Sequence, residues 1–190
     1  MSIILASKSP RRQELLKLLG VEFTIETADI DERMDPALPA QREVSRVAAR
    51  KAAKIAEKHP DDLVIASDTI VVVDGRILGK PKDEADAFSM LRLLSGRRHE
   101  VMTGLCVRQG ARQTCETVIT AVQFRELSDA EIRAYIETSE PMDKAGAYGI
   151  QGRASVFVTG IEGDYFSVMG LPVCRLCQCL RTFGVTILDA

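Results

Sequence analysis

Two consecutive arginines, Arg11 and Arg12, stand in what the sequence predicts to be the first turn of a helix. Ser9 has the residue type of an N-cap, Pro10 suits the first helical position, and an apolar run follows as far as Gly20, a typical C-terminal stop. A helix N-terminus carries partial positive charge and unpaired N–H groups, so two guanidinium groups are unfavourable there unless an anion binds. Phosphate is the usual anion at such a position. The alternative is that both arginines extend into water, at a cost of roughly 0.3–1 kcal/mol each.

A lysine, Lys51, interrupts the apolar face of a second predicted helix, which runs over residues 40–57. The apolar residues of this face recur at helical spacing: Val44, Val47, Ala48, Ala52 and Ile55. Lys51 falls inside that face, whereas Arg46, Arg50 and Lys54 share the opposite one. A buried ammonium group needs a counter-charge, so we expect Lys51 to face an anion. The alternative is that its side chain reaches from the edge of the face into water.

An aspartate, Asp68, follows the apolar strand predicted over residues 63–67. Strand ends in α/β proteins often lie at a ligand site. The pair Asp74-Gly75 predicts a two-residue hairpin turn. Continuing its register places Thr69 opposite Lys80, with Cβ atoms about 5 Å apart. Asp68 would then lie beside the Lys80 ammonium group, which suits phosphate and metal chemistry and equally a structural ion pair.

Hydrophobic periodicity and turn signals predict the elements that must position these residues. Helices are expected over residues 10–20, 40–57, 83–95, 128–138 and 172–184. Asp83 with Asp86 and Ser128 with Glu131 have the spacing of capping boxes at the starts of two of them. Strands are expected over residues 3–6, 21–27 and 63–67, and hairpins over 69–78, 101–124 and 156–169. An acidic loop over 28–39 and a glycine-containing loop over 141–152 complete the chain. Mixed helices and hairpins around one sheet indicate an α/β or α+β protein.

The gross composition is that of a globular protein with one domain over residues 1–190 and room for two lobes. Apolar residues make up 46% of the chain and charged residues 27%, and the net charge of -2 argues against general binding to nucleic acid or membrane surfaces. No signal peptide or membrane span is expected, and a cytoplasmic location follows as the default expectation.

Five cysteines form an odd set: Cys106, Cys115, Cys174, Cys177 and Cys179. The spacing Cys174-x-x-Cys177 resembles half of a zinc site or a redox pair. A second half is missing, and the histidines His59 and His99 lie far away in the sequence. Reduced thiols packed on a C-terminal helix are therefore expected.

Six segments occur in a characteristic order: residues 5–16 (LASKSPRRQELL), 66–71 (ASDTIV), 79–81 (GKP), 94–96 (LSG), 143–152 (DKAGAYGIQG) and 170–172 (GLP). Together they resemble the Maf, or septum formation protein, family of nucleoside triphosphate pyrophosphatases over nearly the whole chain. The resemblance implies an elongated, two-lobed α/β fold of the Maf/ITPase type, with a mixed sheet, flanking helices and a cleft between the lobes. It also implies a homodimer.

The resemblance further implies hydrolysis between the α and β phosphates of a nucleoside triphosphate, with Asp68 as proton acceptor. Residues that line the site by the same resemblance are Ser7, Arg11, Arg12, Glu32, Lys51, Lys80 and Gln151. Arg11, Thr69 and Gln151 match the subgroup that prefers dTTP and UTP, rather than the one that prefers 7-methyl-GTP. The amide of Gln151 can both donate to and accept from the edge of a pyrimidine base, although a flipped amide would also suit cytosine.

The chemistry of the residues agrees with this implied reaction. A triphosphate needs several cations, which Arg11, Arg12, Lys51 and Lys80 would supply. It also needs Mg²⁺ or Mn²⁺, for which Glu32 and Asp68 are the candidate oxygen ligands. Only the resemblance selects Glu32 over the neighbouring carboxylates Asp29, Asp31 and Asp35, and plain solvation of the acidic loop is the alternative. The competing hypothesis for the whole protein is a nucleotide-binding regulator of cell division without turnover.

Overall fold

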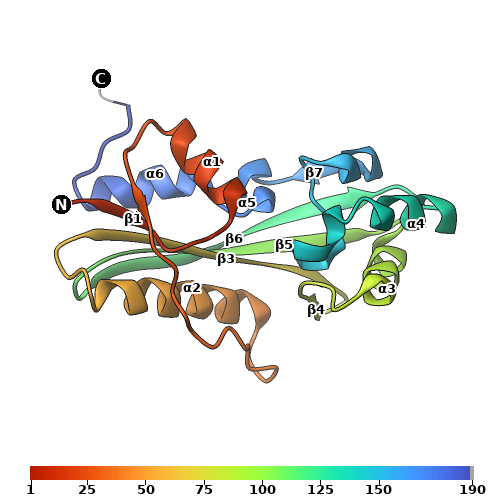
Figure 1. Cartoon of the computed structure of the whole chain (residues 1–190), viewed down its shortest axis with the longest axis horizontal. Coiled ribbons are helices and arrows are strands. Elements are labelled where there is room, and N and C mark those ends of the chain that lie inside the picture. Colours follow the sequence, from red (N-terminus) through yellow and green to blue (C-terminus); the bar gives the residue numbers. More distant parts are fainter. Residues whose placement is uncertain (189–190) are drawn as a thin grey trace. The chain divides into compact units, whose positions relative to one another are not determined.

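The structure, a computed structural model, describes residues 1–188, so residues 189–190 of the predicted domain lie outside the described part. Its strands are β1 (Ile3–Leu5), β2 (Thr24–Ile25), β3 (Leu63–Val73), β4 (Arg76–Leu78), β5 (Arg98–Gln109), β6 (Arg112–Phe124) and β7 (Val158–Glu162). Within the described residues they form one sheet in the order β2-β1-β3-β5-β6-β7, with β4 paired to β3 (Figure 1).

The helices are α1 (Pro10–Leu18), α2 (Ala40–Ala56), α3 (Glu84–Leu94), α4 (Asp129–Glu137), α5 (Tyr165–Met169) and α6 (Val173–Thr182). Three short 3₁₀ helices are η1 (Glu140–Asp143), η2 (Ala145–Ala147) and η3 (Arg153–Phe157). The sheet contains parallel and antiparallel pairs, so the predicted mixed α/β class with flanking helices is confirmed.

The chain divides into two compact units. The first unit contains Met1–Asp68, Thr103–Val118 and the described residues from Gly170 onward. The second unit contains Thr69–Met102 and Ile119–Met169. Each unit is described by itself below.

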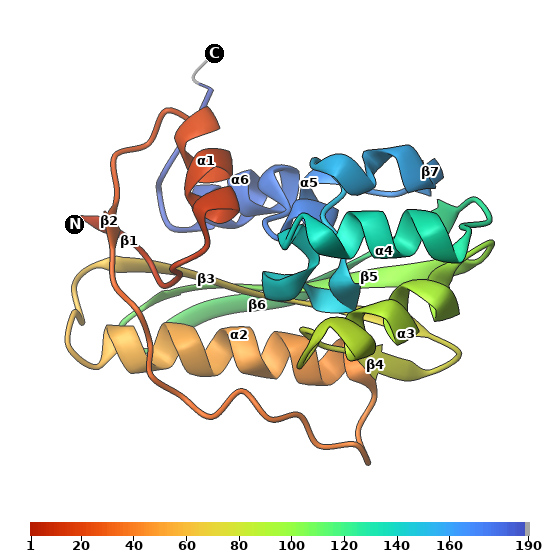
Figure 2. The same ribbon diagram turned by 45° about the vertical axis from the view of Figure 1, so that its right-hand side comes forward.

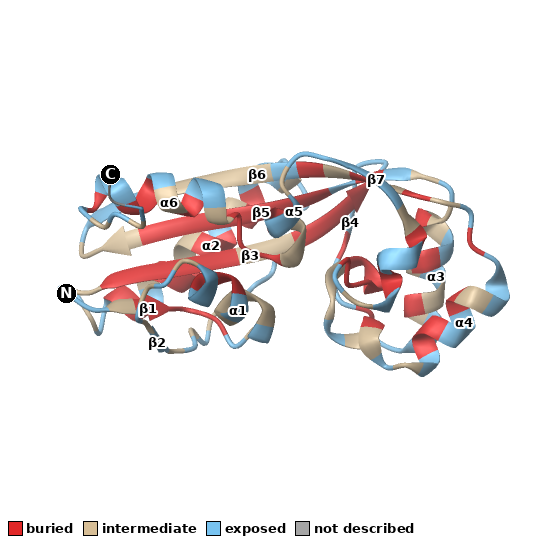
Figure 3. Cartoon of the chain, turned by 90° about the horizontal axis from the view of Figure 1, so that it is seen from above, coloured by how far each residue is buried: buried red, intermediate tan, exposed pale blue. Residues whose placement is uncertain are grey.

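In the first unit, β1 pairs in parallel with both β2 and β3, with Leu5 opposite Ile25 and Ile65. Helix α2 lies on one side of the sheet, and α1 and α6 lie on the other (Figures 1 and 2). The predicted apolar face of α2 forms the core here. Buried residues run along most of β3 and β5, whereas β6 is mostly half-buried (Figure 3).

A glycine lets α2 approach the sheet closely. A Cβ atom on Gly104 of β5 would lie 2.6 Å from the carbonyl carbon of Val44 and 2.8 Å from the Cα of Ser45. A side chain therefore cannot fit between this strand and the first turns of α2. Because Lys51 lies two helical turns after Val44, the same close packing also fixes the height of Lys51 above the sheet.

In the second unit, the predicted hairpin forms around Asp74 and Gly75, both of which have positive φ. Its register is as predicted, with Val71, Val72 and Val73 opposite Leu78, Ile77 and Arg76. The prediction that this register continues to Thr69 and Lys80 is wrong, because β4 ends at Leu78. The carbonyl of Gly79 instead accepts a hydrogen bond of 3.0 Å from the N–H of Gly146.

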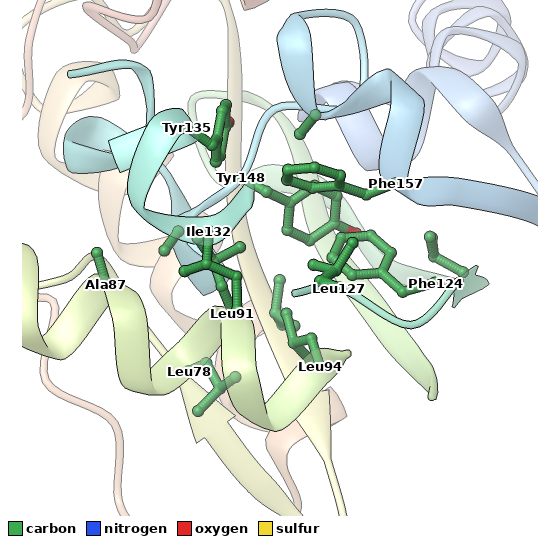
Figure 4. Packing of buried hydrophobic residues seen from close by; sticks show 14 of the residues in the cluster. Leu78, Ala87, Leu91, Leu94, Phe124, Leu127, Ile132, Tyr135, Tyr148 and Phe157 are labelled. Atoms are coloured by element: carbon green, nitrogen blue, oxygen red, sulfur yellow. The ribbon is translucent and has the colours of Figure 1, made fainter. Parts of the chain in front are cut away.

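The core of the second unit is built around aromatic rings. The rings of Phe124 and Tyr148 meet edge to face at 4.8 Å between centroids, and those of Tyr135 and Phe157 at 5.2 Å (Figure 4). Leucines of α3 pack beneath this cluster (Figure 4). The predicted N-terminal caps of α3 and α4 are confirmed. Asp83 accepts a hydrogen bond from the N–H of Asp86 in α3, and Ser128 forms a full capping box with Glu131 in α4.

Three segments differ from their predicted structure. The strand expected over 21–27 is reduced to Thr24–Ile25, because its partner β1 has only three residues. The loop expected over 141–152 contains η1 and η2. The hairpin expected over 156–169 is wrong: β7 pairs with β6, and residues 165–169 form α5, since Asp164 accepts hydrogen bonds from the N–H groups of Phe166 and Ser167.

The cysteines divide into a bonded pair and three free thiols. Cys106 on β5 and Cys115 on β6 form a disulfide that the sequence did not predict. Cys174, Cys177 and Cys179 are free, as expected, although only Cys179 is buried. Burial raises the pKa of Cys179 to about 12, which makes this thiol a poor nucleophile and a poor metal ligand. None of the helices within residues 1–188 is both long and apolar enough to span a membrane.

One buried histidine predicts acid sensitivity. His99 is 2% exposed, and its Nε2 lies 2.8 Å from the hydroxyl of Tyr148. Burial lowers the pKa of His99 to about 4 from an ordinary 6.5. As the pH falls below 6.5, the unfolded chain binds a proton that the folded chain does not take up until about pH 4, so stability is lost across that window.

Between pH 7 and pH 5, His99 should therefore lower the free energy of unfolding by about 2 kcal/mol. Urea unfolding of the wild type and of His99→Gln at both pH values measures this contribution. The variant should lose less stability on acidification than the wild type. An equal loss in both proteins would contradict the assignment.

Candidate functional site

In the first unit, the structure brings a lysine and two acidic residues together. The Nζ of Lys51 donates a hydrogen bond of 2.6 Å to Oδ1 of Asp68 and lies 3.0 Å from Oε1 of Glu32. The side chains of Lys51 and Asp68 are only 9% and 13% exposed, whereas Glu32 is 58% exposed. The expectation that Lys51 faces an anion is thus confirmed, and the alternative of a solvated lysine is excluded.

The contact also distinguishes Glu32 from two other acidic residues of its loop. Asp31 is held by Arg33, whose Nε donates to it at 2.8 Å and lowers the pKa of Asp31 to about 2. Asp35 accepts a hydrogen bond from the N–H of Ala37. Neither interaction involves Lys51, so the geometry agrees with the choice of Glu32 that only the family resemblance had made.

The parallel pairing of β1 and β3 explains why Asp68 lies where it does. The last ladder contact is the 2.8 Å hydrogen bond from the N–H of Ala6 to the carbonyl of Ile65. Ser7 follows Ala6 directly after the end of β1, and Asp68 lies three residues after Ile65 on β3. The prediction that the strand ends before Asp68 is wrong, since β3 continues to Val73. Asp68 nevertheless lies beyond the carboxyl end of β1, where α/β sheets often bind ligands.

Arg12 is fixed by a backbone carbonyl from the far end of the chain. Its Nε donates a hydrogen bond of 2.9 Å to the carbonyl of Gly170, and its Nη1 donates one of 3.3 Å to Oγ of Ser7. The hydroxyl of Ser67 donates to the same carbonyl at 2.9 Å. Residue types and spacing did not predict a role for Ser67 or Gly170. The sequence pointed to them only indirectly: Ser67 precedes Asp68, and Gly170 belongs to segment 170–172, one of the six that carry the family resemblance.

The charged side chains around Arg12 affect its pKa. Burial lowers the pKa of Arg12, the charge of Asp68 opposes this shift, and Arg11 and Glu32 also contribute. Arg11, Arg12 and Lys51 together outnumber the two carboxylates by one positive charge. An excess of cationic groups around partly buried carboxylates favours an anionic ligand.

The start of α1 has the features of an anion-binding helix N-terminus. Ser9 occupies the N-cap position as predicted, but its side chain makes no capping hydrogen bond. Pro10 occupies the first turn, which contains no acidic residue. The helix dipole therefore adds to the positive potential around Arg11 and Arg12.

The second unit contains the other predicted site residues, Thr69, Lys80 and Gln151. Lys80 and Gln151 are exposed. The hydrogen bond between Gly79 and Gly146 joins the segment that carries Lys80 to the loop that carries Gln151. With the register argument removed, the proximity of Lys80 to Asp68 stays a prediction from the family resemblance.

The donor set of the first unit fits a hard divalent cation that is shared with a ligand. Oxygens of Glu32 and Asp68 both lie within 3.0 Å of the Lys51 Nζ, and carboxylate oxygens suit Mg²⁺ or Mn²⁺. In the part of the chain that the structure describes, no three His, Cys, Asp or Glu side chains gather into a metal cluster. Two carboxylates are sufficient where substrate phosphates and water supply the remaining ligands.

Comparisons with known proteins agree with the resemblance. The chain matches the family described as Maf-like protein over residues 2–183. The dTTP/UTP pyrophosphatase of Koribacter versatilis is 51% identical over 185 residues, which cover 97% of this chain and 96% of the relative. The dTTP/UTP pyrophosphatase of Symbiobacterium thermophilum is 48% identical over 185 residues, 97% of this chain and 95% of the relative. That of Bacillus pumilus is 47% identical over 184 residues, 97% of each chain.

The pair of Lys51 and Asp68 should be energetically coupled. Lys51→Met leaves Asp68 without its hydrogen-bond donor, and Asp68→Asn removes the negative charge that faces Lys51. Each variant should destabilise the chain, whereas the double variant should lose less than the sum of the two. We expect a coupling free energy of about 1–3 kcal/mol in a double-mutant cycle by urea unfolding. Lys54→Met, on the exposed face of the same helix, is the matched control and should change stability by less than about 0.5 kcal/mol. Additive effects would show that the pair is not coupled.

Proposed function

Because the chain belongs to the Maf family, we propose that it hydrolyses nucleoside triphosphates, with dTTP and UTP preferred, to the monophosphate and pyrophosphate. The convergence of Arg12, Lys51, Glu32 and Asp68 in the first unit is the observation that supports this most strongly. The relatives named dTTP/UTP pyrophosphatase are about half identical to this chain over nearly their whole length, which supports the same substrates.

The start of α1 and its two arginines are the proposed phosphate-binding groups. Arg12 is oriented by Gly170 and Ser7, so it offers a guanidinium group of fixed direction to a phosphate oxygen. Arg11 and the helix N-terminus add positive potential. Such fixed groups stabilise charge in a transition state without reorganising. We assign Lys80 to the same task on the basis of the family resemblance.

Asp68 is the proposed proton acceptor for the attacking water. Its carboxylate is oriented by the 2.6 Å hydrogen bond from Lys51, and a positioned carboxylate of this kind contributes to proton transfer. Glu32 and Asp68 would hold Mg²⁺ or Mn²⁺, which supplies charge neutralisation and a more acidic water. Lys51 offsets the charge of both carboxylates before substrate binds.

Gln151 is the proposed reader of the base, together with the subgroup residues Thr69 and Arg11. The amide of Gln151 offers a donor and an acceptor to the N3–H and carbonyl edge that thymine and uracil share. A homodimer, which the family resemblance implies, is part of the same proposal. The second candidate, a regulator without turnover, is less favoured because it is compatible with Lys51 but gives Asp68 and a metal no chemical role.

A substrate panel tests the reaction and the base preference. Purified protein with Mg²⁺ should release pyrophosphate from dTTP and UTP, with kcat/KM roughly tenfold above that for CTP, ITP or 7-methyl-GTP. Ion-exchange chromatography should show the monophosphate as the other product. Preference for a purine would overturn the subgroup assignment, and binding without release would favour the regulator.

Replacement of the proposed proton acceptor tests the mechanism. Asp68→Asn keeps the size of the side chain but removes its basicity, so kcat should fall by roughly 10²–10⁴-fold with a smaller change in KM. The exposed Asp61 of the same unit provides a control, and Asp61→Asn should retain wild-type kcat. Near-wild-type pyrophosphate release by Asp68→Asn would rule out this role.

A further inference from the structure

Gln151 lies in a tight turn, directly after two buried residues. The N–H of Gly152 donates a hydrogen bond of 3.0 Å to the carbonyl of Gly149, which closes the four-residue turn. Gly149 and Ile150 are buried and Gly152 is half-buried, whereas the Gln151 side chain is exposed. The backbone of the turn is thus held by the protein while the amide of Gln151 remains accessible.

Glu140, at the start of η1, contacts both sides of this turn. Its Oε2 accepts a hydrogen bond of 3.1 Å from the N–H of Arg153, directly after the turn. Its Oε1 accepts one of 2.9 Å from the hydroxyl of Tyr135, and that hydroxyl accepts one of 3.2 Å from the N–H of Gly149. One carboxylate and one phenol therefore connect the two ends of the turn.

The two glycines of the turn leave space for neighbouring side chains, Gly152 for the Glu140 carboxylate and Gly149 for Lys144. A Cβ atom on Gly152 would lie 2.5 Å from the carboxylate carbon of Glu140. A Cβ atom on Gly149 would lie 2.7 Å from Cε of Lys144, which itself donates a hydrogen bond of 2.6 Å to the carbonyl of Glu140. A side chain at position 152 would therefore have to displace the Glu140 carboxylate, and one at position 149 would have to displace the side chain of Lys144.

Tyr135 anchors this arrangement in the core. Its ring is buried against Phe157 in the aromatic cluster of the second unit (Figure 4). Burial raises the pKa of Tyr135, so its hydroxyl stays protonated and can donate to Glu140. The hydrogen-bond chain thus runs from a rigid core ring through Glu140 to the segment that presents Gln151.

We infer that Glu140 and Tyr135 are positioning residues for base selection: they fix the backbone of the Gly149–Gly152 turn, so that the Gln151 side chain reaches the pyrimidine edge from one fixed position. This inference rests on the proposed role of Gln151. Neither residue has to touch the substrate. A misplacement of a recognition group by about 1 Å is enough to lose most of its selectivity.

The test compares kcat/KM for dTTP with that for CTP in the full-length protein. Glu140→Ala and Tyr135→Phe should each lower the dTTP-to-CTP ratio roughly tenfold, through a higher KM for dTTP and with kcat nearly unchanged. Gln151→Ala should lower the ratio to a similar extent, and adding Glu140→Ala to it should lower the ratio no further, because both act on one interaction. Glu140→Gln keeps one acceptor oxygen and should restore part of the selectivity.

Arg92→Ala is the matched control. Arg92, in the same unit, donates two hydrogen bonds to the carbonyl of Leu127, which lies outside the Gly149–Gly152 turn, so its loss should affect stability but not the ratio. If Glu140→Ala does not fold, Tyr135→Phe and Glu140→Gln still decide the outcome. If Gln151→Ala lowers the ratio but the Glu140 and Tyr135 variants behave like Arg92→Ala, the positioning role is overturned. If Gln151→Ala itself leaves the ratio unchanged, the assignment of base reading to Gln151 is wrong, and this inference falls with it while the pyrophosphatase reaction stands.

Discussion

The placement of a charged lysine inside an apolar helix face is the constraint on which the first unit depends. An unpaired ammonium group at that depth would cost several kcal/mol. Lys51 avoids this cost only because Asp68 from β3 and Glu32 from the acidic loop both reach its Nζ. A helix, a strand and a loop that are far apart in the sequence must therefore meet at one point. The same requirement gathers the charges that phosphate chemistry needs.

Backbone and side-chain contacts hold the residues around Lys51 in position. Gly104 lets α2 settle close to β5, and the carbonyl of Gly170 orients both Arg12 and Ser67. In the second unit the segments that carry Lys80 and Gln151 are likewise joined through backbone atoms. Groups held by their surroundings before the ligand arrives lose little entropy when it binds, which favours catalysis by a fixed electrostatic environment.

Features that depend on local sequence were predictable. The inward position of Lys51 followed from helical spacing, the Asp74-Gly75 turn from its residue types, and the cap at Ser128 from its spacing to Glu131. Features that depend on distant partners were not. Asp164 starts a helix where a strand was expected. Its backbone carbonyl accepts a hydrogen bond from the hydroxyl of Thr120, 44 residues away in the sequence. Glu140 gave no signal at all, because its carboxylate accepts from a tyrosine hydroxyl and from one backbone N–H, a group that nearly every residue has.

The hydrogen bond between Arg12 and Gly170 spans 158 residues of chain. During synthesis the ribosome releases the N-terminal helix long before Gly170 leaves the exit tunnel, so the nascent polypeptide cannot yet orient this guanidinium group. The arginine acquires this hydrogen bond only after Gly170 has left the exit tunnel. A truncated product that ends before Gly170 would retain Arg11, Arg12, Glu32, Lys51 and Asp68. It would still lack the carbonyl that orients the Arg12 guanidinium group.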